Sequence, residues 1–594
     1  MKEYFLMKRS AFASFFLIFS ISFQAICIEL TERDYRVYDA LLHKKSESQN
    51  VQSKSFISTN SGKEIKNIIS LLKRNDEKKR EYVCQFPARA YWINERFYLN
   101  EDISFEHCPD LKKYLDSISA ESISLVYASE NLTSPSSFMG HTYLKINGQN
   151  EKEHAVSYFT EVDTINIPKL MYDSIVTGKE GYFIVSPYQE SEDYYSDIES
   201  RNIYEYHLGL ADFEVKLISL HLWELKDKRI DYFFHTHNCA TITLDILGVV
   251  NPSIIKPGSD WLSPLDVIKI VNQSDMVTQA TVKPSLNWRL RAYGREISNF
   301  EKETLLGYLK NDSYILERNL VNKPALYYHY LLALNEMLYL DNLITEVKWL
   351  NNKNIIDGYF LDKNYTSIDV SNFKNPLRRS SDSQIAIQLV SNHNEDYLQF
   401  DILPASHLLT DDNRHAFSES SLKLLSPKVI LSKNKFKLEK FELYSIAQYI
   451  PYDPIAGGIS GYFSIGYSGF DIYQFDSESR FYSNAGLGLS VQPHPSLQLY
   501  STFGLETSLA HGNIWLTPAF DVGAFAYLKG NNKVSFSSKI LYNEFGSGGY
   551  GIESKLQNSY FWESNKSLVF GFKHKKVDYG HEQLSASAGV KIYY

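Results

Sequence analysis

Residues 233–241, FFHTHNCAT, with the mainly apolar run 242–250 that follows them, decide how the centre of this chain folds. Aromatic and polar residues lead up to Cys239, and the run after it has the composition of a buried helix. We therefore predict a strand or turn that delivers Cys239 to the start of a helix. Backbone N–H groups at a helix start favour a thiolate, as does a neighbouring imidazolium. This placement predicts a reactive thiol with a pKa below its ordinary value.

A histidine that can act as the base lies well upstream of this cysteine. His141 follows Gly140 and precedes the alternating run 142–146, in the stretch SSFMGHTYL at 136–144. This pattern predicts a turn that feeds a strand, with His141 at the strand's first position. Cys239 and His141 together predict a cysteine nucleophile with a histidine base. The alternative is a buried structural cysteine, which the residue types alone leave open.

The start of the chain has the features of a secretory signal peptide. Residues 1–27 carry three basic residues, then the apolar stretch 11–23, and end in Ala25-Ile26-Cys27. This order predicts cleavage after Cys27, with an uncleaved membrane anchor as the alternative. Lipidation at Cys27 is not expected, because Ile26 is not a small residue.

Three cysteines then remain in an oxidising compartment. Cys84 and Cys108 are close enough in sequence to close a short disulfide loop, whereas Cys239 stands in a different context. Cys239, the cysteine left without a disulfide partner, is also the one at the predicted helix start, as expected for a free reactive thiol.

Composition excludes some functions. The formal net charge is −9, and the basic residues are scattered without a patch, which argues against a nucleic-acid partner. After the signal region no apolar run reaches the roughly 18–20 residues that a membrane helix needs. Any further membrane span must therefore be made of strands.

The last third of the chain predicts such strands. In residues 584–594 apolar side chains alternate with polar or small ones, and the chain ends on Tyr594. Similar runs of about ten residues are separated by turn residues, for example Gly530-Asn531-Asn532. We predict an antiparallel barrel of about ten to twelve strands over residues 381–594, set in an outer membrane. A soluble sandwich or lipocalin-like barrel would alternate in the same way.

The other regions predict an N-terminal, mostly helical part at 28–115, which holds the Cys84 and Cys108 loop, and a helical linker at 276–380. No phosphate-binding loop is present, so no cofactor is expected. His235 and His237 lie two apart without a third ligand in view, so no metal site is expected either.

Several motifs together resemble a known family. They are SPSSFMGHTYL at 134–144, VSY at 156–158, WEL at 223–225, YFF at 232–234 and NC at 238–239. In roughly residues 80–275 the chain resembles the Lnb-type lipoprotein N-acyltransferase domain, which is related to circularly permuted papain-like folds such as the lecithin:retinol acyltransferase-like enzymes and the NlpC-type hydrolases. The resemblance implies an α+β papain-like catalytic domain at 116–275.

Two departures from the family pattern concern the site. His237 stands where the family commonly has an acidic residue, and no third catalytic residue is unambiguous. His154, on the strand after His141, and Glu161 are the candidates to orient the imidazole.

The resemblance also implies a reaction and a location. Cys239 would take an acyl chain from a lipid or lipoprotein ester and pass it to an amine, in a domain that faces the periplasm of a Gram-negative bacterium. Two alternatives remain open: a cysteine peptidase that cleaves peptidoglycan, and a non-catalytic outer-membrane assembly or channel protein. A peptidase needs a solvated cleft beside Cys239, and an acyltransferase needs an apolar groove there. The oligomeric state is left open.

Overall fold

The computed structural model describes most of the chain, as residues 29–43, 61–130, 139–161, 166–226, 228, 230–255, 261–311, 324–361, 374–393, 395–433, 435–469, 479–510, 512–542, 549–578 and 582–594. The signal peptide expected at 1–27 lies outside the described residues. The chain divides into two compact units. One comprises Met1–Ser117, Phe213–Arg229 and Asp245–Pro257, and the other Ile118–Asp212, Ile230–Leu244 and Gly258–Tyr594.

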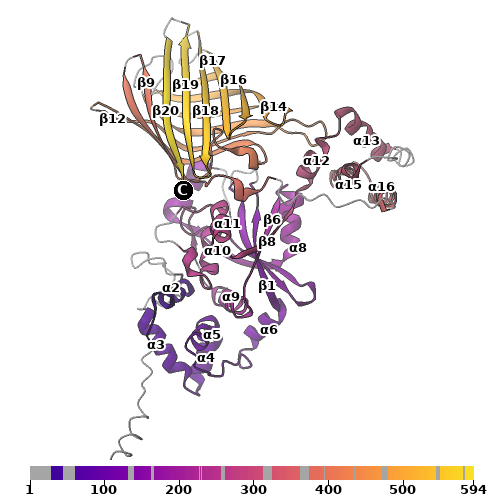
Figure 1. The fold of residues 1–594 in the computed structure, drawn as a ribbon, viewed down its shortest axis with the longest axis vertical. Helices are drawn as coiled ribbons and strands as arrows, with labels where there is room; N and C mark the ends of the chain where they lie inside the picture. Colours follow the sequence, from indigo (N-terminus) through magenta and orange to yellow (C-terminus); the bar gives the residue numbers. More distant parts are fainter. Residues whose placement is uncertain are drawn as a thin grey trace, which may run out of the picture. The chain divides into compact units, whose positions relative to one another are not determined.

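The first unit is helical (Figure 1). Its helices are α2 (Glu32–Leu41), α3 (Ser61–Leu72), α4 (Glu77–Gln85), α5 (Pro87–Arg96), most of α6 (Pro109–Ile118) and most of α9 (Asp212–Leu225). The fully buried Arg89 of α5 pairs with Glu224 of α9 at 3.2 Å, so a late segment completes this core. Cys84 and Cys108 form a disulfide, with their Cα atoms 5.3 Å apart. The helical region at 28–115 is therefore not a continuous domain, because 213–229 and 245–257 belong to it as well.

The second unit begins with a six-stranded antiparallel sheet. Its order is β5-β3-β2-β1-β6-β8, made of β1 (Ala120–Ala128), β2 (His141–Gly148), β3 (Glu153–Phe159), β5 (Tyr182–Pro187), β6 (Ile203–Leu208) and β8 (Val277–Lys283). In the register of the central pair, Ala128 lies opposite His141. A small two-stranded sheet joins β4 (Lys179–Glu180) to β7 (Asp231–Tyr232).

Helices cover both faces of this sheet. α8 (Tyr188–Asp193) packs against β3, and α11 (Pro264–Gln273) packs against β1 and β2. α10 (Cys239–Gly248) begins beside β2, where the Thr243 hydroxyl donates a hydrogen bond to the Thr142 carbonyl at 3.5 Å. α7 (Ile167–Tyr172) lies between β3 and β4 in the chain.

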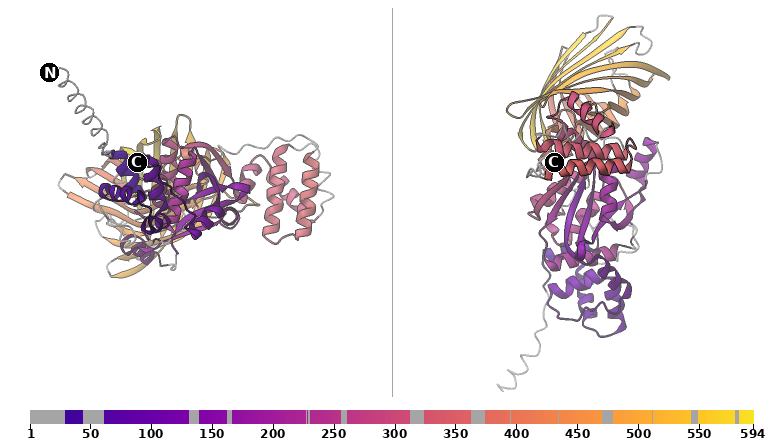
Figure 2. Two further views of the ribbon diagram at one scale, coloured as in Figure 1. Left: turned by 90° about the horizontal axis from the view of Figure 1, so that it is seen from below. Right: turned by 90° about the vertical axis from the view of Figure 1, so that its right-hand side faces the viewer.

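The linker predicted at 276–380 is only partly helical. Its first residues form β8, which pairs with β6, because Val277, Thr278, Thr281 and Val282 are β-branched and favour an extended strand. The rest is helical, with α12 (Leu286–Gly294), α13 (Asn299–Asn311), α15 (Ala325–Leu340) and α16 (Glu346–Leu361). These helices share an apolar core that includes Leu331 and Leu334, and Figure 2 shows α15 and α16 side by side.

The C-terminal region is a closed antiparallel barrel of twelve strands among the described residues (Figure 1). They are β9 (Gln384–Asn392), β10 (Asp396–Leu403), β11 (Glu419–Ser432), β12 (Lys435–Tyr449), β13 (Ser460–Ser468), β14 (Arg480–His494), β15 (Leu497–Ala510), β16 (Asn513–Leu528), β17 (Asn532–Tyr542), β18 (Tyr550–Glu563), β19 (Lys566–Val577) and β20 (Glu582–Tyr593). Pairing of β20 with β9 closes it, so no strand edge is left open.

The two faces of the barrel differ in chemistry. Charged residues face its interior as ion pairs, among them Lys423 with Glu442 at 2.7 Å and Lys539 with Glu506 at 2.7 Å. The outer wall exposes large apolar side chains, such as Leu487 and Phe503. The predicted alternation at the C-terminus is confirmed: Leu584, Val590, Ile592 and Tyr594 are exposed, and Lys591 and Tyr593 are buried.

The predicted fold class is confirmed as an α+β region, helices and a closed barrel. Among the described residues no helix is both long and apolar enough to cross a membrane.

Candidate active site

Cys239 is the first residue of α10, as the sequence predicts, and Asn238 caps this helix. The Asn238 side-chain oxygen accepts from the Thr241 N–H at 2.9 Å, and the Thr241 hydroxyl accepts from the Asn238 N–H at 3.0 Å. This reciprocal cap satisfies helix-start N–H groups that would otherwise lack partners. It also fixes the position of the thiol at the N-terminus of the helix.

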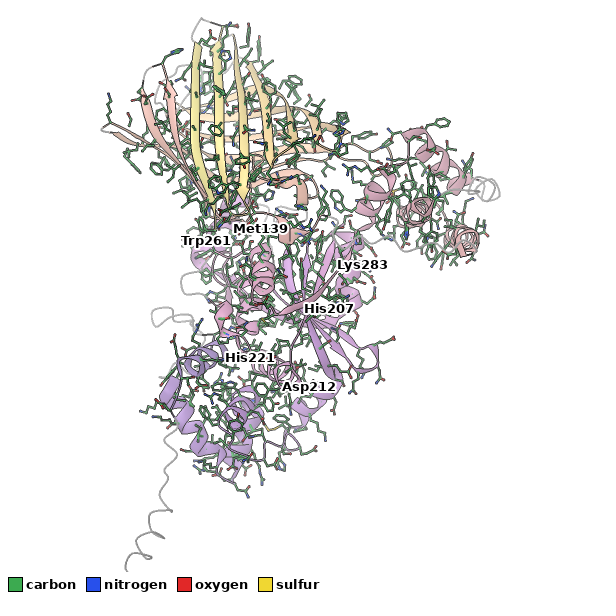
Figure 3. All side chains as sticks on the ribbon, viewed as in Figure 1. Met139, His207, Asp212, His221, Trp261 and Lys283 are labelled. Carbon is green, nitrogen blue, oxygen red and sulfur yellow. A yellow bond between two sulfur atoms is a disulfide. The ribbon has the colours of Figure 1, made fainter. Side chains whose placement is uncertain are left out.

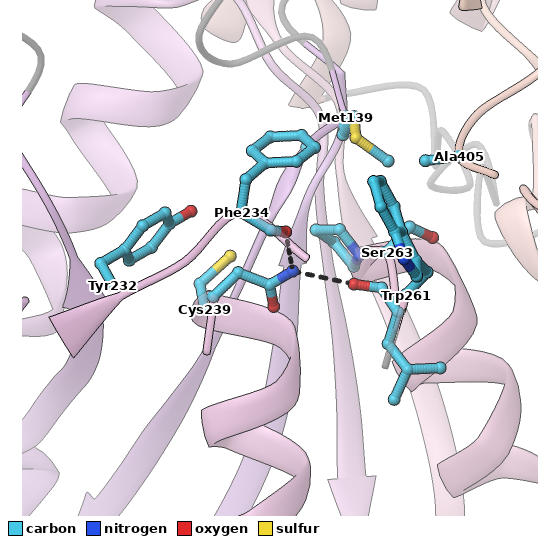
Figure 4. Close-up of a pocket in the computed structure, with 11 residues that line it drawn as sticks. Met139, Tyr232, Phe234, Cys239, Trp261, Ser263 and Ala405 are labelled. Carbon is cyan, nitrogen blue, oxygen red and sulfur yellow. Dashed lines mark hydrogen bonds between the residues drawn. The ribbon is translucent and has the colours of Figure 1, made fainter. Parts of the chain in front are cut away.

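The thiol lies in a pocket with mainly apolar walls (Figure 4). The pocket has a volume of about 40 Å³ and is partly open to solvent. Its lining residues are Met139, Gly140, Tyr232, Phe234, Asn238, Cys239, Trp261, Leu262, Ser263, Pro264 and Ala405. Figure 3 labels Met139 and Trp261, which come from segments far apart in the sequence and share this pocket.

Asn238 also fastens the walls of the pocket. Its side-chain amide donates one hydrogen bond to the Phe234 carbonyl at 2.9 Å and another to the Leu262 carbonyl at 3.0 Å. On the far side of the thiol, the Tyr232 ring stacks on Tyr158, with ring centroids 5.8 Å apart. The Asn-x-x-Thr spacing at 238–241 is a capping signal that sequence reasoning could have used and did not.

Burial raises the pKa of the Cys239 thiol. Interactions with the Thr142 and Ala240 backbone, with the Thr142 side chain and with the positive charge of Arg201 oppose this effect without reversing it. The expected low pKa is therefore wrong for the resting protein, because burial disfavours the thiolate more than the helix start favours it. Only 7 % of the Cys239 surface is exposed.

His141 is the first residue of β2, as predicted, but its contacts are not those expected. Its ring stacks on Tyr143, with ring centroids 5.8 Å apart, and lies at the same distance from Tyr195. Its buried Nε2 has no hydrogen-bond partner among the described residues. At the start of β2 it is Thr142 whose backbone and side chain act on the Cys239 thiol. The structure thus brings the histidine strand to the cysteine helix without a His141–Cys239 hydrogen bond.

Burial, followed by the positive charge of Arg201, lowers the pKa of His141 to about 3. The imidazole is therefore neutral at physiological pH. A buried ring beside a guanidinium does not retain a second positive charge, so no imidazolium is present at rest to favour a thiolate. A neutral imidazole is the form that accepts a proton.

Two residues that sequence reasoning missed lie at this site. The Arg201 guanidinium lies over the Tyr195 ring, 5.2 Å from its centroid, and pairs with Glu199 at 2.7 Å. Arg201 is 98 % buried, and its charge affects both His141 and Cys239. Neither Tyr195 nor Arg201 belongs to a local motif, so the sequence carries no signal for them.

The two candidates to orient the imidazole differ in position. His154 pairs with Ile146, five residues along β2 from His141, so at about 3.3 Å per residue it lies roughly 16 Å away along the strand. The structure therefore does not bring His154 to His141. Glu161 lies two residues beyond the end of β3, and its side chain is exposed.

The histidine pair at 235 and 237 makes aromatic contacts. The His235 ring lies 5.4 Å from Trp261, and His237 shares a hydrogen bond with the Thr236 hydroxyl at 3.1 Å. Among the residues that the structure describes, no group of three or more potential ligands is placed to hold a metal ion.

Three family models match the chain. The model described as Lnb N-terminal periplasmic domain matches residues 110–274. Two models described as domains of unknown function, DUF7840 and DUF7843, match residues 374–593 and 34–96. The central region that holds Cys239 and His141 is thus an Lnb-type periplasmic domain.

Solved barrels show a distant likeness. The KdgM porin in complex with disordered oligogalacturonate is 11% identical, with 36% of this chain and 99% of that chain covered and a TM-score of 0.23. The NanC porin is 7% identical, with 36% and 100% covered and a TM-score of 0.25. An outer membrane channel from Pseudomonas putida F1 is 6% identical, with 38% and 100% covered and a TM-score of 0.25. No curated protein matches the chain.

The periplasmic family model and the barrel's apolar outer wall agree on a location. The protein belongs to the cell envelope of a Gram-negative bacterium, with the barrel in the outer membrane and the Cys239 domain on the periplasmic side.

Proposed function

We propose that this protein, which carries an Lnb-type periplasmic domain, is a cysteine acyltransferase that acts on lipid or lipoprotein acyl esters. The observation that carries the proposal is the pocket around Cys239, which Met139, Phe234 and Trp261 make apolar. Such walls suit a hydrocarbon chain, whose burial gains about 0.8 kcal/mol for each CH₂ group.

In the first half of the reaction the Cys239 sulfur attacks the carbonyl carbon of a lipid ester. The S–C bond forms, the C–O bond to the glycerol breaks, and the thiol proton leaves with the departing alcohol. In the second half an amine nitrogen attacks the thioester carbonyl carbon, the N–C bond of an amide forms, the C–S bond breaks, and a proton from the amine returns to the Cys239 sulfur. No oxidant or metal ion takes part in this balance.

The residues around the thiol supply the other roles. His141, neutral at rest, is the group to move the proton, and apo geometry often tightens only when substrate binds. The backbone N–H groups of Thr142 and Ala240, which act on the Cys239 thiol, are the donors for the oxyanion. Glu161 is the sequence candidate for the third catalytic residue, and burial together with the charge of Arg201 keeps His141 neutral.

The second candidate function is a peptidase that uses the same Cys239 and His141. It needs a solvated cleft lined by hydrogen-bonding groups for a peptide backbone. The pocket instead presents aromatic, thioether and aliphatic side chains, together with Ala405 of the segment before β11. The observed walls favour the lipid ester.

The test is covalent trapping on the full chain in detergent. After incubation with a phospholipid or a diacylated lipopeptide, mass spectrometry should find a fatty-acyl mass on the Cys239 peptide. Cys239→Ala should abolish the adduct, and His141→Ala should lower its rate by orders of magnitude. His494→Ala, on an exposed residue at the end of β14, is the matched control and should keep the wild-type rate. Cleaved muropeptides without any acyl adduct would replace the acyltransferase with the peptidase.

A further inference from the structure

The walls of the Cys239 pocket continue onto the barrel. Met139, Phe234, Trp261 and Ala405 line the pocket and also belong to one apolar cluster. The other members of this cluster come from three neighbouring barrel strands, β11, β12 and β13: Leu422, Leu424, Tyr444, Ile446, Phe463 and Ile465. We call this group the wall cluster.

The barrel members of the wall cluster face outwards. Tyr449 of β12 contacts the ring of Tyr500 on β15, which is not a neighbouring strand, so Tyr449 faces the barrel interior. Lys423 lies opposite Ser445, which shares that face of β12, and so also points into the barrel. Leu422 and Leu424 alternate with Lys423 on β11 and so lie on the opposite, outer face. Tyr444 lies opposite Leu424 in the register of β11 and β12. The outer face of the barrel is the one that meets lipid.

These side chains are covered, unlike the rest of that face. Leu422 is 1 % exposed and Leu424 is 3 % exposed, whereas Leu487 and Leu489 on β14 are 69 % and 55 % exposed. The cover comes from Met139, Phe234 and Trp261, which are only partly buried themselves. At this one place the lipid-facing wall and the wall of the catalytic pocket are the same surface.

The cluster also holds a polar atom without a partner. Tyr444 is 4 % exposed, and its buried hydroxyl has no hydrogen-bond partner among the described residues. A buried hydroxyl without a partner in apolar surroundings is destabilising, so a ligand that accepts its hydrogen bond would explain why it is there. An ester or glycerol oxygen of a lipid lying against the cluster would accept this hydrogen bond.

We propose that the acyl chain of a membrane phospholipid reaches Cys239 sideways, between the outer wall of β11–β13 and the side chains of Met139, Phe234 and Trp261. This inference rests on the proposed function and names the donor and its route. The chain stays in an apolar environment from bilayer to thiol, and the Tyr444 hydroxyl binds an oxygen at its polar end.

The depth of the cluster fits a lipid of the leaflet next to the periplasm. β11 starts at the same end of the barrel as the C-terminus, because β9, β10 and β11 pair antiparallel in succession and β20 ends opposite Gln384, where β9 begins. Leu422 and Leu424 are the fourth and sixth residues of β11. At about 3.3 Å per residue, they lie roughly 10–17 Å along the strand from its first residue. The wall cluster therefore lies toward the end of the barrel that faces the periplasmic domain, which is the end nearest to a lipid of that leaflet.

The experiment uses photolabelling of the full-length Cys239→Ala protein in vesicles of phosphatidylethanolamine and phosphatidylglycerol. A phosphatidylethanolamine with a diazirine in one acyl chain is the probe, and peptide mapping finds the labelled residues. Label is expected on Leu422 or Leu424 and on Met139 or Trp261, although these leucines are covered in the unliganded protein. Exposed Leu489 should be labelled by the surrounding bilayer in any case, which makes it the internal control.

A second arm measures transfer with Cys239 intact. Leu424→Gln should lower acylation of Cys239 from vesicle phospholipid at least tenfold relative to its acylation by soluble p-nitrophenyl acetate. Leu489→Gln, on the same face outside the cluster, should leave that ratio unchanged. Tyr444→Phe should lower the ratio less than Leu424→Gln does.

The outcomes separate the two proposals. Label confined to exposed wall residues such as Leu489, together with an unchanged ratio in Leu424→Gln, overturns the sideways route even if Cys239 becomes acylated. Label on the wall cluster without any acyl adduct on Cys239 supports the route and overturns the proposed function.

Discussion

Asn238 and Leu262 are joined by a hydrogen bond of 3.0 Å from the side-chain amide to the backbone carbonyl. Through it, the residue before the nucleophile holds the segment that carries Trp261 and Ser263 against the start of α10. The helix cap and the pocket wall therefore depend on one side chain.

We expect Asn238→Ala to increase the rate at which iodoacetamide alkylates Cys239, because both the cap and the tie to Leu262 are lost. Loss of the cap alone should cost about 1 kcal/mol of local stability. Asn238→Asp is the matched variant, since it keeps the acceptor for the Thr241 N–H and removes the two donors. If Asn238→Asp alkylates as slowly as wild type, the ties to Phe234 and Leu262 do not hold the pocket closed.

The pH dependence of Cys239 alkylation should reflect the raised pKa of its thiol. The thiolate is the reactive form, so the rate should be low at neutral pH and climb as the pH passes above the ordinary cysteine range. His141 has a pKa of about 3 and stays neutral across this range, so it adds no second inflection. A rate that is already maximal at pH 6 would instead reveal a preformed thiolate–imidazolium pair.

Removal of the Arg201 charge should move this profile. Arg201 lowers the pKa of Cys239, so Arg201→Gln should shift the alkylation profile to still higher pH. Arg295→Gln, at an exposed position, should leave the profile in place. Near-ultraviolet circular dichroism checks that the Arg201 variant keeps its tertiary packing. A profile shift of equal size in both variants would mean that general charge, and not Arg201, sets the thiol pKa.

We expect the disulfide to affect the stability of the helical unit and not the reactivity of Cys239. Double replacement of Cys84 and Cys108 by serine should lower the stability of the helical unit by about 3 kcal/mol, as expected for a loop of this length. Urea unfolding followed by tryptophan fluorescence measures the loss, and Trp92 is buried in that unit. Peptide mapping of the wild type under non-reducing conditions should find Cys239 free. Cys239 bonded to either partner would contradict its assignment as nucleophile.

The folded barrel should migrate differently from the heat-denatured chain in gels. A buried group of polar residues at its last strand, centred on Asp411, allows this stability to be tested with one variant. The Tyr593 hydroxyl and the Lys591 ammonium both bind Asp411, at 3.0 and 2.7 Å. Asp411→Ala should lower the temperature at which the folded form is lost, because a buried cation is left unpaired. Asp412→Ala, beside it and paired instead with Arg414 at 2.6 Å, should have a smaller effect.

Local patterns made much of this architecture predictable. Alternation at 584–594 indicated the face of β20, and the polar-to-apolar change at Asn238 indicated the start of α10. Both signals lie within a few neighbouring residues. The spacing of Cys84 and Cys108 likewise predicted the disulfide loop in the N-terminal region.

What the sequence did not reveal depends on distant contacts. The pKa of Cys239 follows from burial by Tyr232, Phe234 and the segment after 260, and a helix-start argument does not include that cost. Arg201 and Tyr195 are brought to the site by the tertiary fold, and no local sequence motif marks them. His154 was a plausible partner by order along the chain, but the register of β2 and β3 places it at the wrong end of the strand.

The segmented path of the first unit has a consequence for secretion. A chain that is threaded through a membrane from its N-terminus delivers α2 to α5 first, yet their core also needs Glu224 and the residues of 245–257. The helical unit therefore cannot finish folding until translocation has passed Pro257, by which point the β1–β6 strands and Cys239 have already emerged. Truncation after residue 115 would remove α9 and leave the buried Arg89 without Glu224, so residues 28–115 are not a separable module for expression.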